Sequence, residues 1–207
     1  MAQESIYVVP HKIAGLFPMV NSFIAEGEDL VLINTGLNNG SGRNIIKRLE
    51  SLGHRLSDVD LCIITHAHRD HVGGLKILKE TRPPFLVATH DSEADDVEKA
   101  TGIEVDLRLI DGQTVGGFNV IYLPGHTLGS IALLRGDTLI TGDALNGGGT
   151  ELKGHNPMFS KDRKLAEASA RSLANFDFDK VLVGHGSGVE KGGKEVLLRL
   201  IERMSEP

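Results

Sequence analysis

The amino-acid sequence predicts a layered α/β sandwich. Short apolar runs rich in β-branched residues recur along the chain, helical patterns lie between them, and glycine or proline turns separate the two. The 207 residues, of which 40% are hydrophobic and 24% charged, suffice for one domain with a sizeable core. No repeat, low-complexity tract or long linker interrupts this order. We therefore expect one domain over residues 1–207.

The first half of the chain predicts strands that alternate with helices. An early hairpin is expected to end in a short buried strand at 31–33, which exits through Asn34-Thr35-Gly36. A helix then opens at Gly40, has Ile45, Ile46 and Leu49 on one face, and stops at Gly53. The elements expected after it are a buried strand at 59–65, a helix at 75–81 and a strand at 85–88.

The second half predicts strands joined by tight turns, followed by two helices. Polar turn pairs such as Asp111-Gly112 and Gly136-Asp137 mark the connections. Ser160 is the expected N-cap of the first of the two helices. The strands expected here lie at 105–110, 118–123, 130–134, 138–141 and 181–183, and the helices at 162–175 and 193–204.

The segment His66-Ala67-His68-Arg69-Asp70-His71 carries the strongest chemical signal. It directly follows the strand that ends at Thr65, and imidazole and carboxylate groups are the ligands of zinc and neighbouring first-row metals. Residues two apart in an extended segment point the same way, so His66 and His68 can bind one ion. Asp70 and His71, where the chain turns toward a helix, could bind a second. The alternative is a polar surface loop.

Three further candidate ligands also follow predicted strands. His126 comes just past the strand ending at Leu123, and Asp143 and His185 just past the strands at 138–140 and 181–183. Each has a glycine beside it, which lets backbone approach closely. Catalytic groups cluster on loops that a rigid scaffold positions. Each residue alone could be an ordinary loop residue, but together they predict a metal site.

These residues closely resemble the metallo-β-lactamase superfamily, whose pattern is HxHxDH, then a lone histidine often preceded by glycine, an aspartate and a final histidine. Their order and approximate spacing match from about residue 19 to 188. The resemblance implies a four-layer αββα sandwich with the site in the cleft between its two sheets. It also implies two sets of metal ligands with Asp143 bridging the ions: His66, His68 and His126 for one metal, and Asp70, His71 and His185 for the other.

One position departs from the family pattern. The superfamily usually has an aspartate before the Thr-Gly that follows the early strand, whereas this chain has Asn34. The position is a supporting neighbour rather than a ligand, and such partners commonly tune metal affinity. We therefore expect the departure to alter the tuning of the site and not its presence.

The resemblance implies a hydrolase with two divalent metal ions, for which zinc is favoured and manganese or iron are alternatives. A hydroxide between the ions would attack a carbonyl or phosphoryl centre. In the catalytic roles implied, Asp143 holds the ions' spacing and Asp70 orients the hydroxide or relays a proton.

The substrate is narrowed by features that the sequence lacks. Only residues 187–207 follow the last motif, where thioesterases of hydroxyacyl-glutathione generally carry a helical extension. Ala144-Leu145-Asn146 lacks the tyrosine typical of acyl-homoserine lactonases. We expect a small ester, thioester or lactone, with a phosphoester as a further option. Two other classes stay open: a sulfur dioxygenase with a single non-haem iron on the same scaffold, and a non-catalytic, metal-stabilised binding module.

Composition bounds the partners. The net charge is −6 and no basic stripe is present, so a small-molecule substrate is expected rather than nucleic acid. No apolar stretch approaches the roughly 20 residues of a membrane span, and the acidic N-terminus lacks the features of a secretory signal, so we expect a cytoplasmic protein. Cys62, the only cysteine, cannot form an intramolecular disulfide and is expected to pack as a small hydrophobe. The oligomeric state stays open.

The remaining histidines carry weaker signals. His155 lies in the glycine-rich segment 147–157, which has no periodicity and could be a lid over the site. It would then contact substrate; the alternative is a solvated loop. His11 and His54 are expected in surface loops or at helix ends, and His90 follows a strand but lacks neighbours of ligand type.

Overall fold

A computed structural model describes residues 5–12, 19–80 and 85–204. Its first β-sheet has six strands in the order β1-β2-β3-β4-β5-β6. The first three strands pair antiparallel and the last four pair parallel. Their bounds are β1 Ser5–His11, β2 Val20–Glu26, β3 Val31–Ile33, β4 Leu61–Ile63, β5 Leu86–His90 and β6 Leu107–Leu109.

The second sheet has five strands in the order β13-β10-β9-β8-β7, and a third, small sheet has the order β12-β11-β14. Within the second sheet only the β10–β13 pair is parallel. The bounds are β7 Thr114–Val115, β8 Phe118–Tyr122, β9 Ile131–Arg135, β10 Thr138–Ile140 and β13 Lys180–Leu182 for the second sheet, and β11 Leu145–Gly148, β12 Leu152–Gly154 and β14 Gly186–Ser187 for the third.

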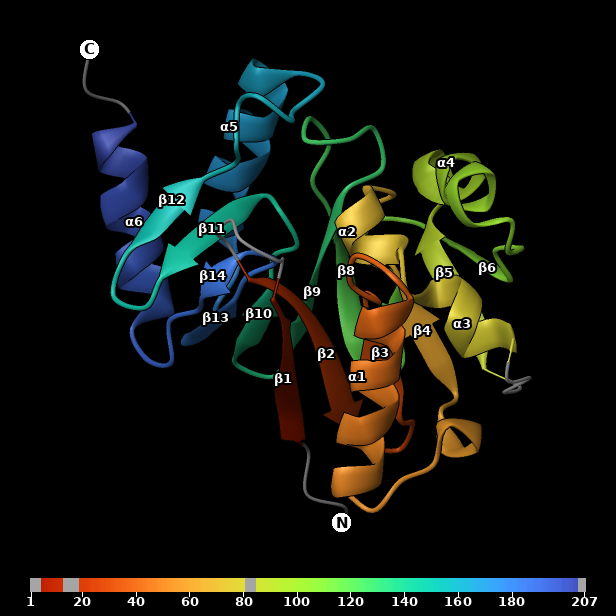
Figure 1. Cartoon of the computed structure of the whole chain (residues 1–207). Coiled ribbons are helices and arrows are strands. Elements are labelled where there is room, and N and C mark those ends of the chain that lie inside the picture. The colour runs from red at the N-terminus through yellow and green to blue at the C-terminus, as the bar shows by residue number, and fades with distance from the viewer. Residues whose placement is uncertain (1–4, 13–18, 81–84, 205–207) are drawn as a thin grey trace.

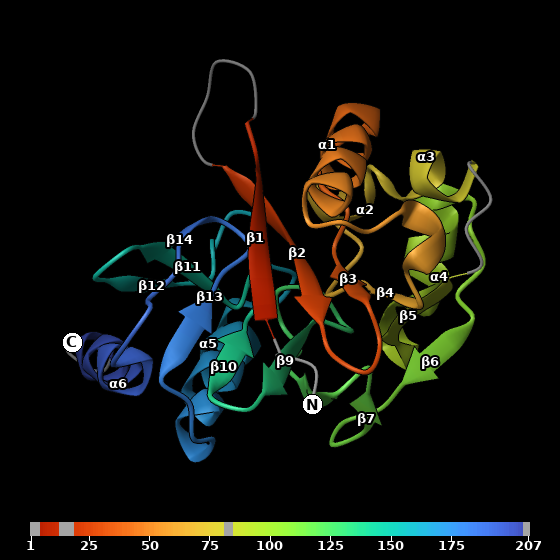
Figure 2. The same ribbon diagram turned by 90° about the horizontal axis from the view of Figure 1, so that it is seen from below.

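Helices cover the outer faces of the two large sheets. Figures 1 and 2 show α1, α3 and α4 on the side of the first sheet and α5 and α6 on the side of the second. The crossovers between parallel strands place the first group there, because such strands can only be joined over a face of the sheet. The helix bounds are α1 Asn39–Ser51, α2 Arg69–Val72, α3 Leu75–Glu80, α4 Asp91–Thr101, α5 Arg163–Ser172 and α6 Gly193–Arg203, with short 3₁₀ turns at Leu56–Asp58 and Leu173–Asn175.

Alternation of side chains along the strands creates the layers. In β4, Leu61 and Ile63 face the second sheet, whereas Cys62 faces the helices. In β9, Ile131 and Leu133 face the first sheet and Ala132 faces α5 and α6. Three separate hydrophobic clusters result, one between the sheets and one beneath each helical layer. The predicted αββα sandwich is confirmed.

Cys62 behaves as the sequence predicts. Its side chain is fully buried, and burial raises the pKa of its thiol to about 12. A thiol in this state is neither a nucleophile nor a metal ligand at neutral pH.

Several elements differ from the expected ones. The helix expected at 162–175 begins at Arg163, and its N-cap is Asp162 rather than Ser160. The strands expected at 105–110 and 118–123 lie in different sheets, as β6 and β8. The segment expected to be an aperiodic loop over 147–157 contains the end of β11 and the whole of β12. His11, expected in a surface loop or at a helix end, is buried at the end of β1.

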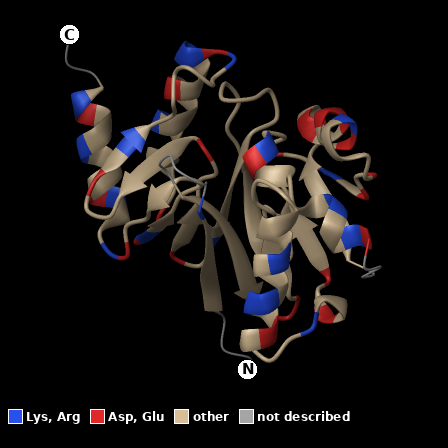
Figure 3. Cartoon of the chain, viewed as in Figure 1, with Lys and Arg blue, Asp and Glu red and all other residues tan. Residues whose placement is uncertain are grey.

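Charged residues lie mostly on the helices and loops, and the strands between them are nearly free of charge (Figure 3). This distribution is the one that buried sheets require, because an unpaired charge in the interior is costly. None of the helices in the described ranges is long and apolar enough to cross a membrane.

Candidate metal centre

The seven residues predicted as ligands lie at the ends of four strands or just beyond them. His66, His68, Asp70 and His71 follow β4, and α2 begins directly after His68. His126 follows β8, Asp143 follows β10 and His185 follows β13. Because β10 and β13 are parallel, their carboxyl ends place Asp143 and His185 at the same edge of the second sheet. The fold therefore brings distant parts of the chain to one point.

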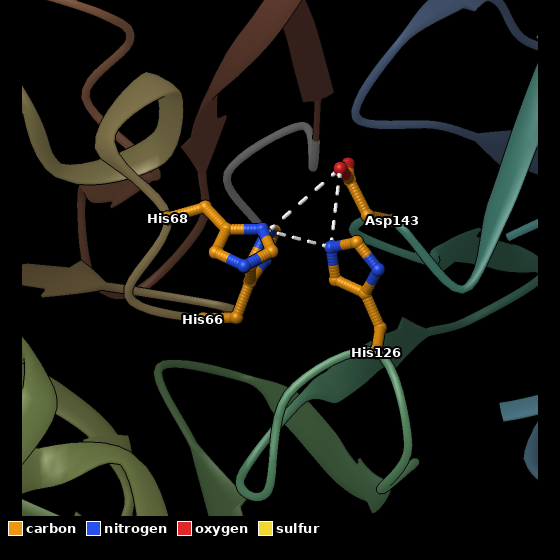
Figure 4. A group of neighbouring side chains, drawn as sticks. All are labelled: His66, His68, His126 and Asp143. Atoms are coloured by element: carbon orange, nitrogen blue, oxygen red, sulfur yellow. Dashed lines mark hydrogen bonds and ion pairs between the residues drawn. The ribbon is translucent and has the colours of Figure 1, made fainter. Parts of the chain in front are cut away.

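The seven side chains form two adjacent groups. Within each group the candidate ligand atoms all lie within 4.8 Å of one another. Figure 4 shows the imidazole rings of the first group turned towards the carboxylate of Asp143. The first group is His66, His68, His126 and Asp143, and the second is Asp70, His71 and His185.

Asp143 lies between the two groups. Its Oδ2 is 3.5 Å from Nε2 of His126, in the first group, and 3.3 Å from Nε2 of His185, in the second. Its Oδ1 is 3.2 Å from Nε2 of His71. Only 10% of the side chain is exposed. One buried carboxylate thus faces ligand atoms of both groups, as a bridging residue must.

Buried polar atoms at this centre lack hydrogen-bond partners. Among the described residues, Nε2 of His66, Nε2 of His71 and Oδ1 of Asp143 are buried and make no hydrogen bond. The last two are 3.2 Å apart but are not aligned as a hydrogen bond. Buried groups of this kind are usually satisfied, because leaving them unpaired is costly. Imidazole and carboxylate atoms left unpaired around one point form a donor set that fits metal cations.

The electrostatics also suit cation binding. Burial lowers the pKa of His66 well below its ordinary value and that of His126 to about 4, so both rings are neutral at neutral pH. Burial alone would raise the pKa of Asp143, but the surrounding histidines, His71 first among them, hold it well below its usual range. Neutral imidazoles and an ionised carboxylate are the forms that bind metals.

His185 carries the opposite shift. Burial alone would lower its pKa, but hydrogen bonds to the carboxylates of Asp143 and Asp70 raise it to about 10. Its Nε2 is 3.1 Å from Oδ2 of Asp70. Without a metal, this imidazole is therefore a cation held between two carboxylates. It would have to release its proton before binding a metal.

Ser160 contacts His126 and was not predicted from the sequence as a residue of the site. Its Oγ lies 2.9 Å from the carbonyl oxygen of Asn156 and donates to it. The same oxygen lies 3.1 Å from Nδ1 of His126 and 2.6 Å from Nδ1 of His155. Since its one proton goes to Asn156, Ser160 accepts from both rings. His126 then keeps its proton on Nδ1. Its Nε2, which faces Oδ2 of Asp143 at 3.5 Å, has a lone pair that accepts from Nδ1 of His68 at 3.0 Å.

His155 does not lie in an open loop over the site, where the lid hypothesis placed it. Its side chain is buried, with 6% of the residue exposed, and it contacts Ser160 directly after β12. The preceding strands β11 and β12 pair through their backbones, and β14 adds a third strand from far along the chain. His155 reaches the centre through Ser160 and His126 rather than from an open loop.

Glu93 is the second supporting residue that the sequence did not reveal. It lies on α4 and is fully buried. Its Oε1 accepts from the backbone N–H of Ala67 at 2.7 Å, and its Oε2 accepts from Gly129 N at 2.7 Å and Thr127 Oγ1 at 2.8 Å. Ala67 lies between two of the histidines, and Thr127 directly follows His126. One carboxylate therefore ties together the two loops that carry the first group.

The other histidines lie in ordinary structural settings. His90 caps α4 and stacks on Tyr122 with ring centroids 4.2 Å apart. His54 pairs with Glu26 at 2.8 Å near the surface. Both rings thus contact residues outside the two ligand groups.

Comparison with known proteins places this geometry in a family. The model of the metallo-beta-lactamase superfamily matches residues 16–185. The chain is 32% identical to the uncharacterized protein YobT of Bacillus subtilis over 200 residues, covering 83% of this chain and 84% of that protein. It is 37% identical over 109 residues to a hydroxyacylglutathione hydrolase of Rhodopseudomonas palustris, covering 47% of this chain and 39% of that enzyme. This chain thus matches less than half of that enzyme's length.

A solved structure agrees with the fold. The crystal structure of TTHA1623 in a di-iron-bound form superposes with a TM-score of 0.71 at 27% identity, covering 90% of this chain and 96% of that one. The family model spans most of the residues and all seven candidate ligands. The chain therefore belongs to the metallo-beta-lactamase superfamily and is a metal-dependent hydrolase.

Proposed function

We propose that the protein uses two divalent metal ions to hydrolyse a small ester, thioester or lactone. The observation that carries the proposal is the position of Asp143, whose two carboxylate oxygens face histidines of both groups at 3.2–3.5 Å. A site for one ion would not need a second cluster of ligands around the same carboxylate. The proposed ligands are His66, His68 and His126 for one ion and Asp70, His71 and His185 for the other, with Asp143 shared.

Two bound cations would supply Lewis acidity, lowering the pKa of water and polarising the carbonyl oxygen of the substrate. Zinc is favoured by the ligand types, with manganese or iron as alternatives. The similar structure named for its di-iron-bound form supports a site of two ions and keeps iron in the comparison.

The two carboxylates have different surroundings and therefore different proposed roles. The side chain of Asp143 is 10% exposed and that of Asp70 is 26% exposed. The buried carboxylate holds the spacing of the ligands. The more accessible carboxylate of Asp70 can orient a water molecule and accept its proton, which is the task of a general base.

The substrate class rests on two supports. The relatives named as hydroxyacylglutathione hydrolases act, by that name, on a thioester. A hollow of about 370 Å³ beside the centre is lined by His68 and Thr127 and by residues of α4, so a small substrate could reach the first group of ligands there. A phosphoester is a further candidate, because the same ions can polarise a phosphoryl oxygen.

Elemental analysis and a substrate panel test the proposal together. Protein purified without chelator should carry about two metal equivalents per chain and hydrolyse at least one of an ester, a thioester, a lactone and a phosphodiester. The chelated protein should lose activity and regain it with zinc. One equivalent of iron with oxygen-dependent turnover would instead establish the single-iron dioxygenase, and tight metal binding without any turnover would favour the binding module.

A further inference from the structure

Asn34 lies between the loops that carry His66 and His71. It is fully buried at the exit of β3, and it is the one non-glycine residue of the described ranges with a positive φ, at 58°. Its Oδ1 accepts from Thr65 N at 2.9 Å and from Thr65 Oγ1 at 3.1 Å. Its Nδ2 lies 2.9 Å from Nδ1 of His71. One amide therefore contacts both candidate metal groups, directly or through Thr65.

The orientation of this amide follows from its neighbours. Amide oxygen and nitrogen are hard to distinguish by shape, but a backbone N–H can only donate. The group facing Thr65 N must therefore be the oxygen, and the NH₂ group faces His71. That NH₂ can only donate, so Nδ1 of His71 must accept with a lone pair.

The position of one proton on His71 is thereby fixed. A neutral imidazole carries a single proton, and with Nδ1 accepting it must sit on Nε2. Nε2 is the atom that faces Asp143 Oδ1 at 3.2 Å and Asp70 Oδ2 at 4.0 Å, where a metal would bind. A metal requires the lone pair that this proton occupies.

The same amide prepares His66 in the opposite way. Thr65 Oγ1 can donate its proton to Asn34 Oδ1 and then accepts from Nδ1–H of His66, which is 3.1 Å away. His66 then has its lone pair on Nε2, facing the centre. His126 is prepared in the same sense by Ser160. Nε2 of His126 accepts from Nδ1 of His68 at 3.0 Å, so the first group also holds a proton, but that proton is shared between two ligands and no amide from outside the group fixes it. In the second group, by contrast, the NH₂ group of Asn34 opposes the ligand form of His71.

We propose that Asn34 makes the two metal positions unequal by holding His71 with its proton on Nε2. The inference rests on the proposed two-metal function and assigns the tight position to the group of His66, His68, His126 and Asp143. To bind a metal at the second group, the protein must either turn the Asn34 amide, which loses its bond with Thr65 N–H, or remove the proton from Nε2.

Asn34→Asp removes the conflict. A carboxylate of the same shape accepts from Thr65 N–H, from Thr65 Oγ1–H and from Nδ1–H of His71 at once. Aspartate, like asparagine, tolerates the left-handed backbone at this position. The substitution should therefore keep the fold and favour the ligand form of His71.

The test withdraws zinc from the loaded full-length chain with chelators of graded affinity. The original chain should release its two ions in separated steps, and Asn34→Asp should tighten the weaker ion by about 10–100-fold with little effect on the tighter one. Asn38→Asp is the charge control. Asn38 lies four residues after Asn34, is exposed and is the N-cap of α1. Aspartate caps a helix equally well. An equal shift in this control would attribute the effect to charge and overturn the inference.

Nitrogen NMR of the histidine side chains reads the proton position directly. With one zinc equivalent bound, His71 should carry its proton on Nε2 in the original chain and on Nδ1 in Asn34→Asp. A proton on Nδ1 in the original chain, or two ions of unchanged affinity in the variant, would overturn the inference and leave the proposed function intact. Failure of both proteins to bind zinc would instead refute the proposed function.

Discussion

Glu93→Gln tests whether one buried carboxylate holds the loops of the first ligand group. Glutamine keeps the size of the side chain but turns one acceptor into a donor. Both ends of Glu93 face backbone donors, Ala67 N on one side and Gly129 N on the other, each at 2.7 Å. The new NH₂ group must therefore face an N–H group whichever way the amide turns. This conflict cannot be relieved by water, because Glu93 is fully buried.

The magnitude follows from the bonds that change. Hydrogen bonds to charged groups contribute about 1.5–3 kcal/mol each, and a buried donor left unsatisfied costs about 1–3 kcal/mol. The carbonyl oxygen of the glutamine still accepts a hydrogen bond, but a neutral one of about half the strength. The NH₂ group replaces an acceptor, so the hydrogen bond at that end is lost. We therefore expect the free energy of unfolding to fall by about 2–4 kcal/mol, a large share of the stability of an ordinary domain.

Urea unfolding of the chelated and the zinc-loaded protein measures this effect. The zinc affinity of the tighter position should also fall, by about 10–100-fold, because Ala67 and Thr127 adjoin its histidines. Asp96→Asn on the same helix is the matched control: its pair with Lys161, at 3.3 Å, is about half exposed and should contribute no more than about 1 kcal/mol. Wild-type stability and zinc affinity in Glu93→Gln would refute the role assigned to this carboxylate.

Three further substitutions have definite outcomes. Asp143→Asn should lose the weaker metal and most turnover, whereas the control Asp137→Asn, in an exposed turn, should change neither. If Asp143→Asn keeps two metals and near-normal turnover, Asp143 does not bridge the ions. Ser160→Ala should weaken the tighter zinc position by about 10–100-fold in chelator competition, since Nδ1–H of His126 loses its acceptor; an unchanged affinity would show that Ser160 does not orient the ring. Burial lowers the pKa of His11 from 6.5 to about 4. Between these pH values the imidazole is protonated in the unfolded chain but neutral in the folded chain. Stability should therefore fall by up to about 3 kcal/mol between pH 6.5 and 4, at about 1.36 kcal/mol per pH unit. His11→Gln should lose this part of the pH dependence in unfolding curves, and parallel curves for the two proteins would contradict it.

The candidate ligands could be predicted because their chemistry and position are both local properties of the sequence. Imidazole and carboxylate groups at strand exits need only the strand pattern and the residue types to be recognised. The six-residue segment after β4 is such a case, and the structure brings it within reach of Asp143. The layers could be predicted for a similar reason, since alternating apolar residues in β4 and β9 already divide their side chains between two faces.

The supporting residues could not be predicted because their roles depend on contacts across the chain. Helix α4 buries only Ala94 and Val97 among its apolar residues, which is too weak a periodic signal to mark a helix. Glu93 is buried there because backbone donors of two other loops meet it. The strands β11 and β12 are held by backbone pairing in a glycine-rich segment, where side chains give no period to detect.

Glu93 and Asn34 allow the polarity of hydrogen bonds to be separated from charge. Glu93→Gln puts a donor against donors and should weaken zinc binding, whereas Asn34→Asp removes a donor that opposes the ligand form of His71 and should strengthen it. Net charge alone predicts the same two signs, because the first change removes a negative charge and the second adds one. The two surface controls separate charge from hydrogen-bond polarity. Asp96→Asn removes one negative charge and Asn38→Asp adds one, and neither changes the hydrogen bonds of Glu93 or Asn34. If both controls bind zinc as the original chain does, the direction of individual hydrogen bonds, and not the field of the protein, sets the affinity of each metal position.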